Sequence, residues 1–345
     1  MRKRSGDTGR LCAIVEIFSR VTVTVLCDLV ADEFVFGEIS RVSREAPVLI
    51  LRHRERTVLP GGGANAVNNL ADLGVTVLPV GIVGNDEPGR LLLRTFRHKK
   101  IPVSGILKDK SHATITKTRI LAGMPHTWRQ QVVRIDREPE GFPGTHMTRE
   151  LALAARQYLQ ASDALLISDY GYGAASPEIA GAVLLKRPSG TMPVVLDSRR
   201  RMLQFSGITA ATPNEPEAEE ALGMSIGQDW KQLCAAGQAI MSRMKLKSLV
   251  ITRGREGMVA FRRKQRPPID IPIFGGDEVA DVTGAGDTVI ATYTAALAAG
   301  AEPDDAAQLA NYAGGIVVMK RGTATVSQQE LLQALEKAPP QTRPH

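Results

Sequence analysis

The feature that most constrains the fold is an alternation of short apolar runs and longer helical segments after about residue 147. The strand-like runs include DALLIS at 163–168, PVVLD at 193–197 and SLVIT at 248–252, and helical patterns such as 150–160 and 229–244 separate them. Aliphatic and β-branched runs of this length are typical of buried strands. Strands that alternate with helices predict an α/β fold, with a mostly parallel central sheet and helices on both faces.

The earlier part of the chain adds strand patterns of another kind. Segments 33–56 and 113–137 contain extended pieces that place long polar side chains on one face. We interpret them as discontinuous parts of a small β-sheet lid. The span 20–337 is then predicted to be one domain, with residues 1–19 as an N-terminal extension and 338–345 as a proline-rich, disordered tail.

Composition argues against several classes of protein. The net charge of +7 comes with only short basic clusters, and aromatic residues make up 4% of the chain, too few for a single-strand stacking platform. No apolar run reaches the roughly 18 residues that a membrane span needs, and the N-terminus lacks the apolar core of a signal peptide. Cys12, Cys27 and Cys234 form no CxxC pair. We therefore expect a cytoplasmic protein with free thiols that binds neither nucleic acid nor membrane.

The segment DVTGAGDT, Asp281–Thr288, is the strongest candidate for chemistry. Gly284, Ala285 and Gly286 leave backbone N–H groups open at the start of an alanine-rich helical pattern, and a helix N-terminus attracts anions. Helix capping alone does not need three small residues followed by the acid Asp287. Backbone donors for a transferring phosphoryl group and a carboxylate base for the attacking hydroxyl are what phosphoryl transfer requires. We predict that Asp287 is that base.

DxTGAGD followed by a small-residue helix resembles the second signature of the PfkB, or ribokinase-like, carbohydrate kinases. PGGGANAVNNLADLG, residues 60–74, is similar to the sugar-binding segment of that family. Gly62 and Gly63 let the backbone approach a sugar, and the amide of Asn65 can donate and accept toward its hydroxyls. The alternative is a plain turn with an asparagine cap. The resemblance covers roughly residues 20–335 and implies the ribokinase-like fold, a central parallel sheet with a small β-sheet lid.

Carboxylates elsewhere fit the same resemblance. Asp28 and Asp32 follow the first predicted strand as CDLVADEF, at the edge where open α/β sheets bind ligands, and either is a candidate to grip a sugar. The alternative for Asp28 is a loop cap, and Cys27 stands where the family usually has glycine. Asn214 and Glu217 match the motif that arranges Mg²⁺ and its waters, or else form the acidic start of a helix.

The resemblance also implies a nucleotide site and a cation loop. ITRGREG, residues 251–257, is either a hairpin turn or part of the ATP site, and ANYAGG, from Ala310, is similar to the helix on the adenine side. The residues implied in nucleotide binding are Asn214, Thr252, Arg253, Gly254, Gly257, Asn311 and Gly314. Asp281 and Thr283 match a loop where many members of the family hold a monovalent cation. ATP, Mg²⁺ and K⁺ are therefore the candidate cofactors.

Within the family, ISRVSREAPV, ATITKTRIL, QQVVRID and SDYGYG look most like the heptose 7-phosphate kinases. Such enzymes use ATP to phosphorylate the anomeric hydroxyl of D-glycero-D-manno-heptose 7-phosphate, a precursor of the lipopolysaccharide core. Lys117, Arg119 and Arg134 on lid strands then hold the remote phosphate, unless they only form surface salt bridges. Tyr172 stands where those kinases usually have lysine, and the turn at 124–131 is longer than theirs.

The sequence thus predicts an ATP-dependent kinase for heptose 7-phosphate. Many relatives carry an adenylyltransferase domain after the kinase, and since the sequence ends at His345 we expect that activity to be absent. A kinase for another sugar, sugar phosphate or nucleoside is one alternative, and a catalytically silent sugar- or nucleotide-binding regulator is another. An uncovered sheet edge favours pairing between subunits, which predicts a homodimer through the lid.

Overall fold

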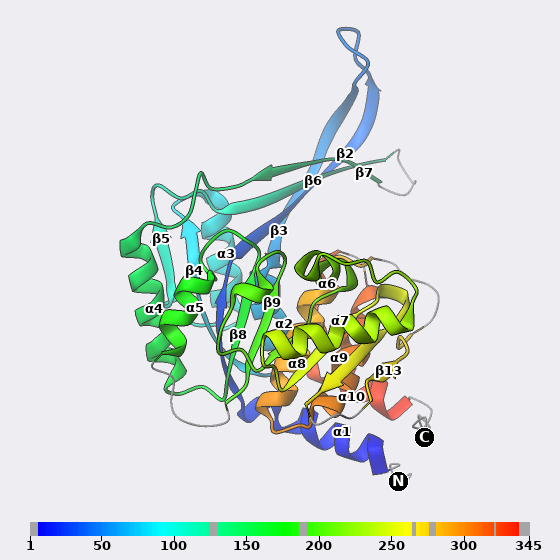
Figure 1. The fold of residues 1–345 in the computed structure, drawn as a ribbon. Helices are drawn as coiled ribbons and strands as arrows, with labels where there is room; N and C mark the ends of the chain where they lie inside the picture. The colour runs from blue at the N-terminus through cyan, green and yellow to red at the C-terminus, as the bar shows by residue number, and fades with distance from the viewer. Residues whose placement is uncertain are drawn as a thin grey trace.

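Two β-sheets organise the computed structural model, which describes residues 6–123, 130–185, 192–263, 267–275, 281–320 and 322–337 (Figure 1). The strands are β1 (Thr22–Cys27), β2 (Leu29–Val42), β3 (Leu49–Gly62), β4 (Thr76–Gly84), β5 (Ile106–Asp109), β6 (Ile115–Gly123), β7 (Gln130–Arg137), β8 (Ala164–Asp169), β9 (Val194–Ser198), β10 (Ala210–Ala211), β11 (Ser248–Thr252), β12 (Met258–Arg262) and β13 (Ile269–Ile271). The α-helices are α1 (Gly6–Ile17), α2 (Gly63–Asp72), α3 (Glu87–His98), α4 (Thr145–Leu159), α5 (Pro177–Leu184), α6 (Glu215–Leu222), α7 (Trp230–Arg243), α8 (Ala285–Ala298), α9 (Pro303–Val318) and α10 (Gln328–Lys337).

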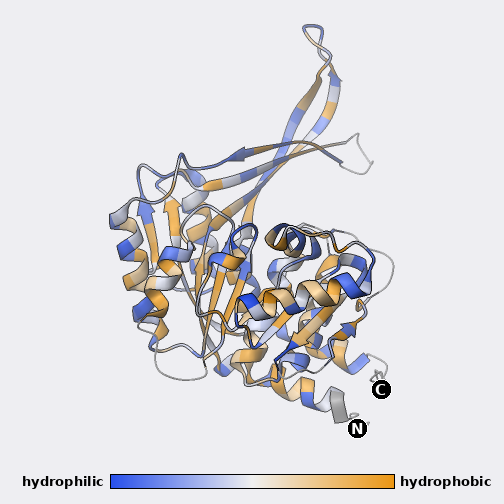
Figure 2. Cartoon of the chain, viewed as in Figure 1, coloured by the Kyte–Doolittle hydropathy of each residue, from blue (hydrophilic) through white to orange (hydrophobic). Residues whose placement is uncertain are grey.

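The main sheet has nine strands in the order β13-β12-β11-β10-β9-β8-β1-β4-β5. The strands from β11 to β5 are parallel, and β12 and β13 add an antiparallel edge. Helices cover both faces, and the apolar residues concentrate in the strands between them (Figure 2). Along β1, Val23 and Val25 face one core and Leu26 faces the other, so both faces of this strand are buried. The predicted α/β architecture is confirmed.

The lid sheet, formed by β2, β3, β6 and β7 in the order β3-β2-β6-β7, projects from the main body (Figure 1). We predicted only short strand pieces within 33–56, but β2 and β3 are each 14 residues long and extend the lid to 29–62. They pair along their whole length, with register shifts at Phe36/Gly37 and Ile39/Arg41. Residues 52–56 of β3 are all exposed, so this part of the sequence lacks the alternation that burial of one face imposes.

The segment predicted as an N-terminal extension contains α1, which packs against α10. Leu11, Cys12, Val15 and Phe18 are buried in the core, so this part of the extension belongs to the folded body. The predicted tail, 338–345, and the lid turn at 124–129 lie outside the described residues. Within the described ranges, no helix is both long enough and apolar enough to span a membrane.

Candidate active site

Asp287 lies in the first turn of α8, with its side chain 4% exposed. Each carboxylate oxygen accepts one hydrogen bond, Oδ2 from the amide of Asn65 at 3.0 Å and Oδ1 from the hydroxyl of Tyr170 at 2.7 Å. Burial raises the pKa of Asp287 to about 6, and the two hydrogen bonds limit the rise. A carboxylate with this pKa is suited to accept a proton near neutral pH.

The turn before Asp287 is shaped by glycine. Gly284 has φ 80°, and a Cβ there would lie 2.5 Å from Nδ2 of Asn65. The N–H of Ala285 donates to the carbonyl of Val282 at 3.2 Å and is already satisfied. Gly286 is exposed, a Cβ there would meet nothing within 4 Å, and its N–H has no acceptor in the described part of the chain. The N–H of Ala285 is thus used within the turn, whereas that of the exposed Gly286 is open to an anion.

Asn65 is fully buried near the start of α2, where it reaches across to α8. The helix begins so close to β1 that a Cβ on Gly63 would lie 2.5 Å from Cβ of Cys27, which is why residue 63 is a glycine. The amide of Asn69 donates to Oδ1 of Asn65 at 3.2 Å, and the Thr288 hydroxyl donates to Oδ1 of Asn69 at 2.9 Å. This chain of polar contacts fixes the Asn65 amide so that its Nδ2 points at the carboxylate of α8.

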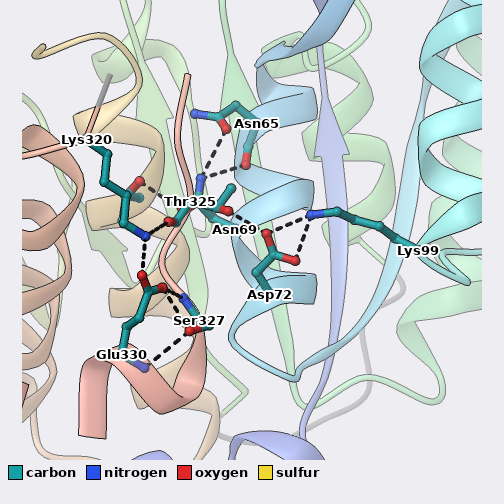
Figure 3. A network of polar contacts seen from close by, with 9 residues as sticks. Asn65, Asn69, Asp72, Lys99, Lys320, Thr325, Ser327 and Glu330 are labelled. Atoms are coloured by element: carbon teal, nitrogen blue, oxygen red, sulfur yellow. Dashed lines mark hydrogen bonds and ion pairs between the residues drawn. The ribbon is translucent and has the colours of Figure 1, made fainter. Parts of the chain in front are cut away.

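A polar network at the other end of α2 holds the helix in place (Figure 3). Asp72 accepts from Nζ of Lys99 at 2.7 Å and from the hydroxyl of Thr325 at 2.5 Å. Lys320 donates to the carbonyl of Thr325 at 2.7 Å and pairs with Glu330 at 2.6 Å. The segment between α9 and α10 is thereby tied to the helix that carries the site asparagine.

Asp32 is buried on β2, near enough to Asp287 to contribute to the rise of its pKa. Its Oδ1 is paired with Arg119 at 2.5 Å, and its Oδ2 accepts from the hydroxyl of Thr323 at 3.3 Å. A Cβ on Gly61 would overlap Oδ2 of Asp32 at 2.4 Å, so glycine is required at that position. The structure therefore brings the carboxylate of Asp32 close enough to Asp287 to raise its pKa.

Asp28 has a different role from the one we favoured. It is fully buried, and its carboxylate accepts the backbone N–H groups of Tyr170, Tyr172 and Ala174 at 2.9, 3.0 and 2.8 Å. Burial raises its pKa to about 6. Asp28 caps the turn after β8, which was the alternative reading, and we do not retain it as a sugar ligand.

The predicted lid cations differ in how far they are paired. Arg119 forms an ion pair with Asp32. Arg134 is half exposed and forms an ion pair with Asp136 at 2.8 Å. Lys117 is buried, and its nearest carboxylate oxygen, on Asp136, is 3.9 Å away. Burial lowers the pKa of Lys117, and the nearby positive charge of Arg199 lowers it further. Lys117 is thus a buried cation whose one ion pair among the described residues, with Asp136, is long.

The predicted magnesium motif forms a capping box, since Oδ1 of Asn214 accepts from the N–H of Glu217 at 2.8 Å and Oε2 of Glu217 accepts from the N–H of Asn214 at 2.9 Å. Asp197, at the carboxyl end of β9, faces the same glutamate. Burial raises the pKa of both acids, and the charge of Glu217 raises that of Asp197 further. No group of three potential metal-ligating side chains occurs in the described ranges.

On the predicted nucleotide side, several residues have structural partners. Arg253 pairs with Glu215 at 2.8 Å. Gly257 has φ 88°, and a Cβ there would lie 2.1 Å from the carbonyl oxygen of Ile271, so packing explains this glycine. Asn311 is buried and donates to the carbonyl of Pro272 at 2.8 Å, which occupies its amide.

The remaining predicted ligands lie on loops or within packed helices. Thr252 ends β11 beside Asn214, and Gly254 has φ 55° with nothing within 4 Å of an added Cβ, so both stay candidates. A Cβ on Gly314 would meet Val289 at 3.0 Å. Asp281 accepts from the N–H groups of Thr283 at 2.9 Å and Gly322 at 3.1 Å, and thus clasps two loops. K⁺ binding at Asp281 and Thr283 stays a prediction.

Sequence reasoning assigned no role to Tyr170, Asp197, Arg199 or Thr323. Asp197 could have been predicted as a site residue from the sequence, because it follows an apolar strand-like run, as Asp28 does. Tyr170 belongs to SDYGYG, which served only as a mark of resemblance. Thr323 offered no signal, since its contact with Asp32 joins residues 291 positions apart.

A buried carboxylate at the open N-terminus of a helix, at the edge of a parallel sheet and beside a β-sheet lid, defines a kinase of the ribokinase-like class. Residues 30–330 match the family described as pfkB family carbohydrate kinase, and the chain belongs to this family. It is a phosphotransferase that acts on a sugar hydroxyl group.

Similar proteins support both the family and the fold. The chain is 40% identical over 316 residues to the bifunctional protein HldE of Geobacter metallireducens and 38% identical over 330 residues to that of Pelobacter propionicus. These matches cover 91% and 94% of this chain but only 63% and 66% of the relatives. Arabidopsis thaliana ribokinase complexed with ribose and ATP superposes with a TM-score of 0.71 at 19% identity, covering 92% of this chain and 99% of that one. Escherichia coli phosphofructokinase-2 in complex with potassium also gives 0.71, at 16% identity and with 92% and 98% coverage. The predicted ribokinase-like fold is confirmed.

Proposed function

We propose that this chain uses ATP to phosphorylate the anomeric hydroxyl of D-glycero-D-manno-heptose 7-phosphate, with Asp287 as the general base. The observation that carries the proposal is the Asp287 carboxylate, held by Asn65 beside the open start of α8. The base takes the proton of the attacking hydroxyl, and the phosphoryl group in transfer lies against the free N–H of Gly286. Asp32, on the lid side, accepts hydrogen bonds from the sugar hydroxyls.

The substrate assignment rests on the likeness to the heptose 7-phosphate kinases, on relatives named HldE and on the lid cations. Arg119 and Arg134 already have close carboxylate partners, whereas Lys117 has none closer than 3.9 Å. A buried ammonium that is held near another cation gains most from a dianion placed between them. We assign Lys117, with Arg199 facing it, to the phosphate that the sugar already bears.

Mg²⁺ fits the acidic side of the same site. Burial raises the pKa of both Asp197 and Glu217, the charge of Glu217 raises that of Asp197 further, and Oε2 of Glu217 is used by the capping box. A hard cation that keeps most of its waters needs only one or two carboxylates, and it relieves their repulsion. Bound there, Mg²⁺ would neutralise charge on the phosphates of ATP. Thr252 and Gly254, on the loop after β11, are the residues we assign to the nucleotide.

We also propose a homodimer that pairs through the lid sheet. Val132, Val133 and Ile135 on β7 are 46%, 45% and 56% exposed, and Val42 and Leu49 near the lid tip are 59% and 46% exposed. Apolar side chains along an uncovered sheet favour burial against a second copy.

The test is ATP consumption with Mg²⁺ against heptose 7-phosphate, fructose phosphates, ribose and adenosine, with Asp287→Asn as the blank. Selective turnover of heptose 7-phosphate supports the proposal. Turnover of a different compound in the panel keeps the kinase and discards the heptose assignment.

A kinase for another sugar phosphate is the second candidate. One observation favours it: Tyr172 replaces the usual lysine of the heptose kinases, and its hydroxyl donates to Glu138 at 2.7 Å. Comparable kcat/KM values for a fructose phosphate and the heptose phosphate would support this candidate.

A further inference from the structure

Tyr170 connects the turn after β8 to the N-terminus of α8. Its hydroxyl lies 2.7 Å from Oδ1 of Asp287, and the two residues are 117 positions apart. Asn65 donates to the other carboxylate oxygen at 3.0 Å. The base is therefore held from two sides, by one donor on each oxygen.

The tyrosine is itself fixed at three points. Its backbone N–H donates to Oδ2 of Asp28 at 2.9 Å, and the guanidinium carbon of Arg199 lies 4.3 Å from the centre of its ring. A Cβ on Gly62 would lie 3.3 Å from the ring edge, so the backbone of the glycine turn passes close beside it. Because its backbone is held by a buried carboxylate and its ring lies between a stacked cation and a neighbouring backbone, this residue has little freedom to turn. The three contacts aim its hydroxyl at Asp287.

The direction of the hydrogen bond follows from charge. Burial raises the pKa of Tyr170 well above its ordinary value, and the negative charge of Asp287 raises it further. The phenol thus keeps its proton and donates, and the carboxylate accepts. Each carboxylate oxygen has two lone pairs, so a substrate hydroxyl can still bind the face that neither Tyr170 nor Asn65 occupies.

We propose that Tyr170 is a positioning residue for the catalytic base: its hydroxyl orients the Asp287 carboxylate toward the sugar hydroxyl and keeps it ionised. The inference rests on the proposed role of Asp287. A fixed donor matters here because the negative charge of Asp32 also acts on Asp287 and favours its protonated form. Arg199 is the nearby cation that opposes this effect.

The test compares Tyr170→Phe with Tyr172→Phe. Both changes remove one hydroxyl from the same turn, but that of Tyr172 contacts Glu138 at the surface. For Tyr170→Phe we expect the acid limb of the kcat/KM profile to move up by about one pH unit, with kcat about tenfold lower and KM for ATP within about twofold. The acid limb for Tyr172→Phe should lie at the same pH as that of the wild type.

A second variant covers the case in which phenylalanine at position 170 destabilises the protein. Fluorotyrosine at position 170 makes the hydroxyl a stronger donor, so the acid limb should move to lower pH. An unshifted limb in both Tyr170 variants, or equal shifts in Tyr170→Phe and Tyr172→Phe, overturns the inference while leaving Asp287 as the base. If Asp287→Asn retains turnover, the base assignment itself fails.

Discussion

The amide of Asn65 donates to Oδ2 of Asp287 at 3.0 Å, although the two residues are 222 positions apart. The contact joins the glycine-rich start of α2 to the glycine-rich start of α8. It explains why Gly284 must lack a side chain, since a Cβ there would lie 2.5 Å from the same amide nitrogen. The two motifs that stood out in the sequence thus meet at the proposed active site.

Replacing the proposed base should remove turnover and spare nucleotide binding. Asp287→Asn keeps the shape of the side chain but cannot accept a proton, so we expect kcat to fall by about a thousandfold. ATP affinity, measured by calorimetry, should change little. Asp163→Asn is the control, because this carboxylate caps the backbone of Thr22 at the opposite end of the sheet. Near-normal turnover in Asp287→Asn would falsify the assignment.

The pH dependence of kcat/KM should report the base of the free enzyme. The pKa of Asp287 is raised by burial to about 6, and the carboxylate must be ionised to accept a proton. Activity should therefore rise as the pH increases through about 6 and be lost below it. Initial rates measured from about pH 5 to 8 test this. An acid limb near 4, the value of an ordinary aspartate, would contradict it.

Gly286 should matter to the reaction and not to the fold. A Cβ there would meet nothing within 4 Å, so Gly286→Ala leaves the melting temperature nearly unchanged. If a phosphoryl group approaches this N–H, the added methyl group should lower kcat/KM by about tenfold or more. Gly181→Ala on α5, where an added Cβ also meets nothing, is the matched control. Unchanged kinetics in Gly286→Ala would move the anion site elsewhere.

The lid lysine should act on phosphorylated substrates only. Removing a buried charge that binds a dianion costs about 10- to 100-fold in KM, so Lys117→Ala should raise KM for a sugar phosphate by this factor. Turnover of an unphosphorylated analogue should change far less. Arg134→Ala, which removes an exposed cation already paired with Asp136, should have the smaller effect on KM. A larger rise in KM for Arg134→Ala than for Lys117→Ala would assign the phosphate of the sugar to Arg134 instead.

The lid should carry the subunit contact. Ile135 is 56% exposed on β7, and Ile135→Lys places a charge in the proposed interface. Light scattering should give a dimer for the wild type and a monomer for the variant, with equal circular dichroism spectra. Leu185→Lys, at an 84% exposed position outside the lid, should remain dimeric. A wild-type monomer at micromolar concentration would argue against the lid dimer.

Several assignments could not be made from the sequence because they depend on which partner a polar group finds. Asp28 and Asp32 both follow β1, but the first caps the turn after β8 and the second faces the site. Gly257 and Asn311 matched nucleotide motifs. A backbone carbonyl, however, lies where a side chain at Gly257 would be, and another backbone carbonyl accepts from the amide of Asn311. In each case the deciding neighbour is distant in the chain.

The sequence by itself determined the alternation of elements, the parallel sheet and the two glycine-rich turns, because apolar periodicity and glycine's freedom at positive φ act locally. It also made Asp287 the candidate base, since an acid after three small residues is unusual within a short window. Only the tertiary structure decided which partner each carboxylate finds, which lid cation has the longest ion pair among the described residues and which tyrosine donates to Asp287. Those outcomes depend on burial and on hydrogen bonds between residues more than 80 positions apart, such as Asp32 with Arg119 and Tyr170 with Asp287.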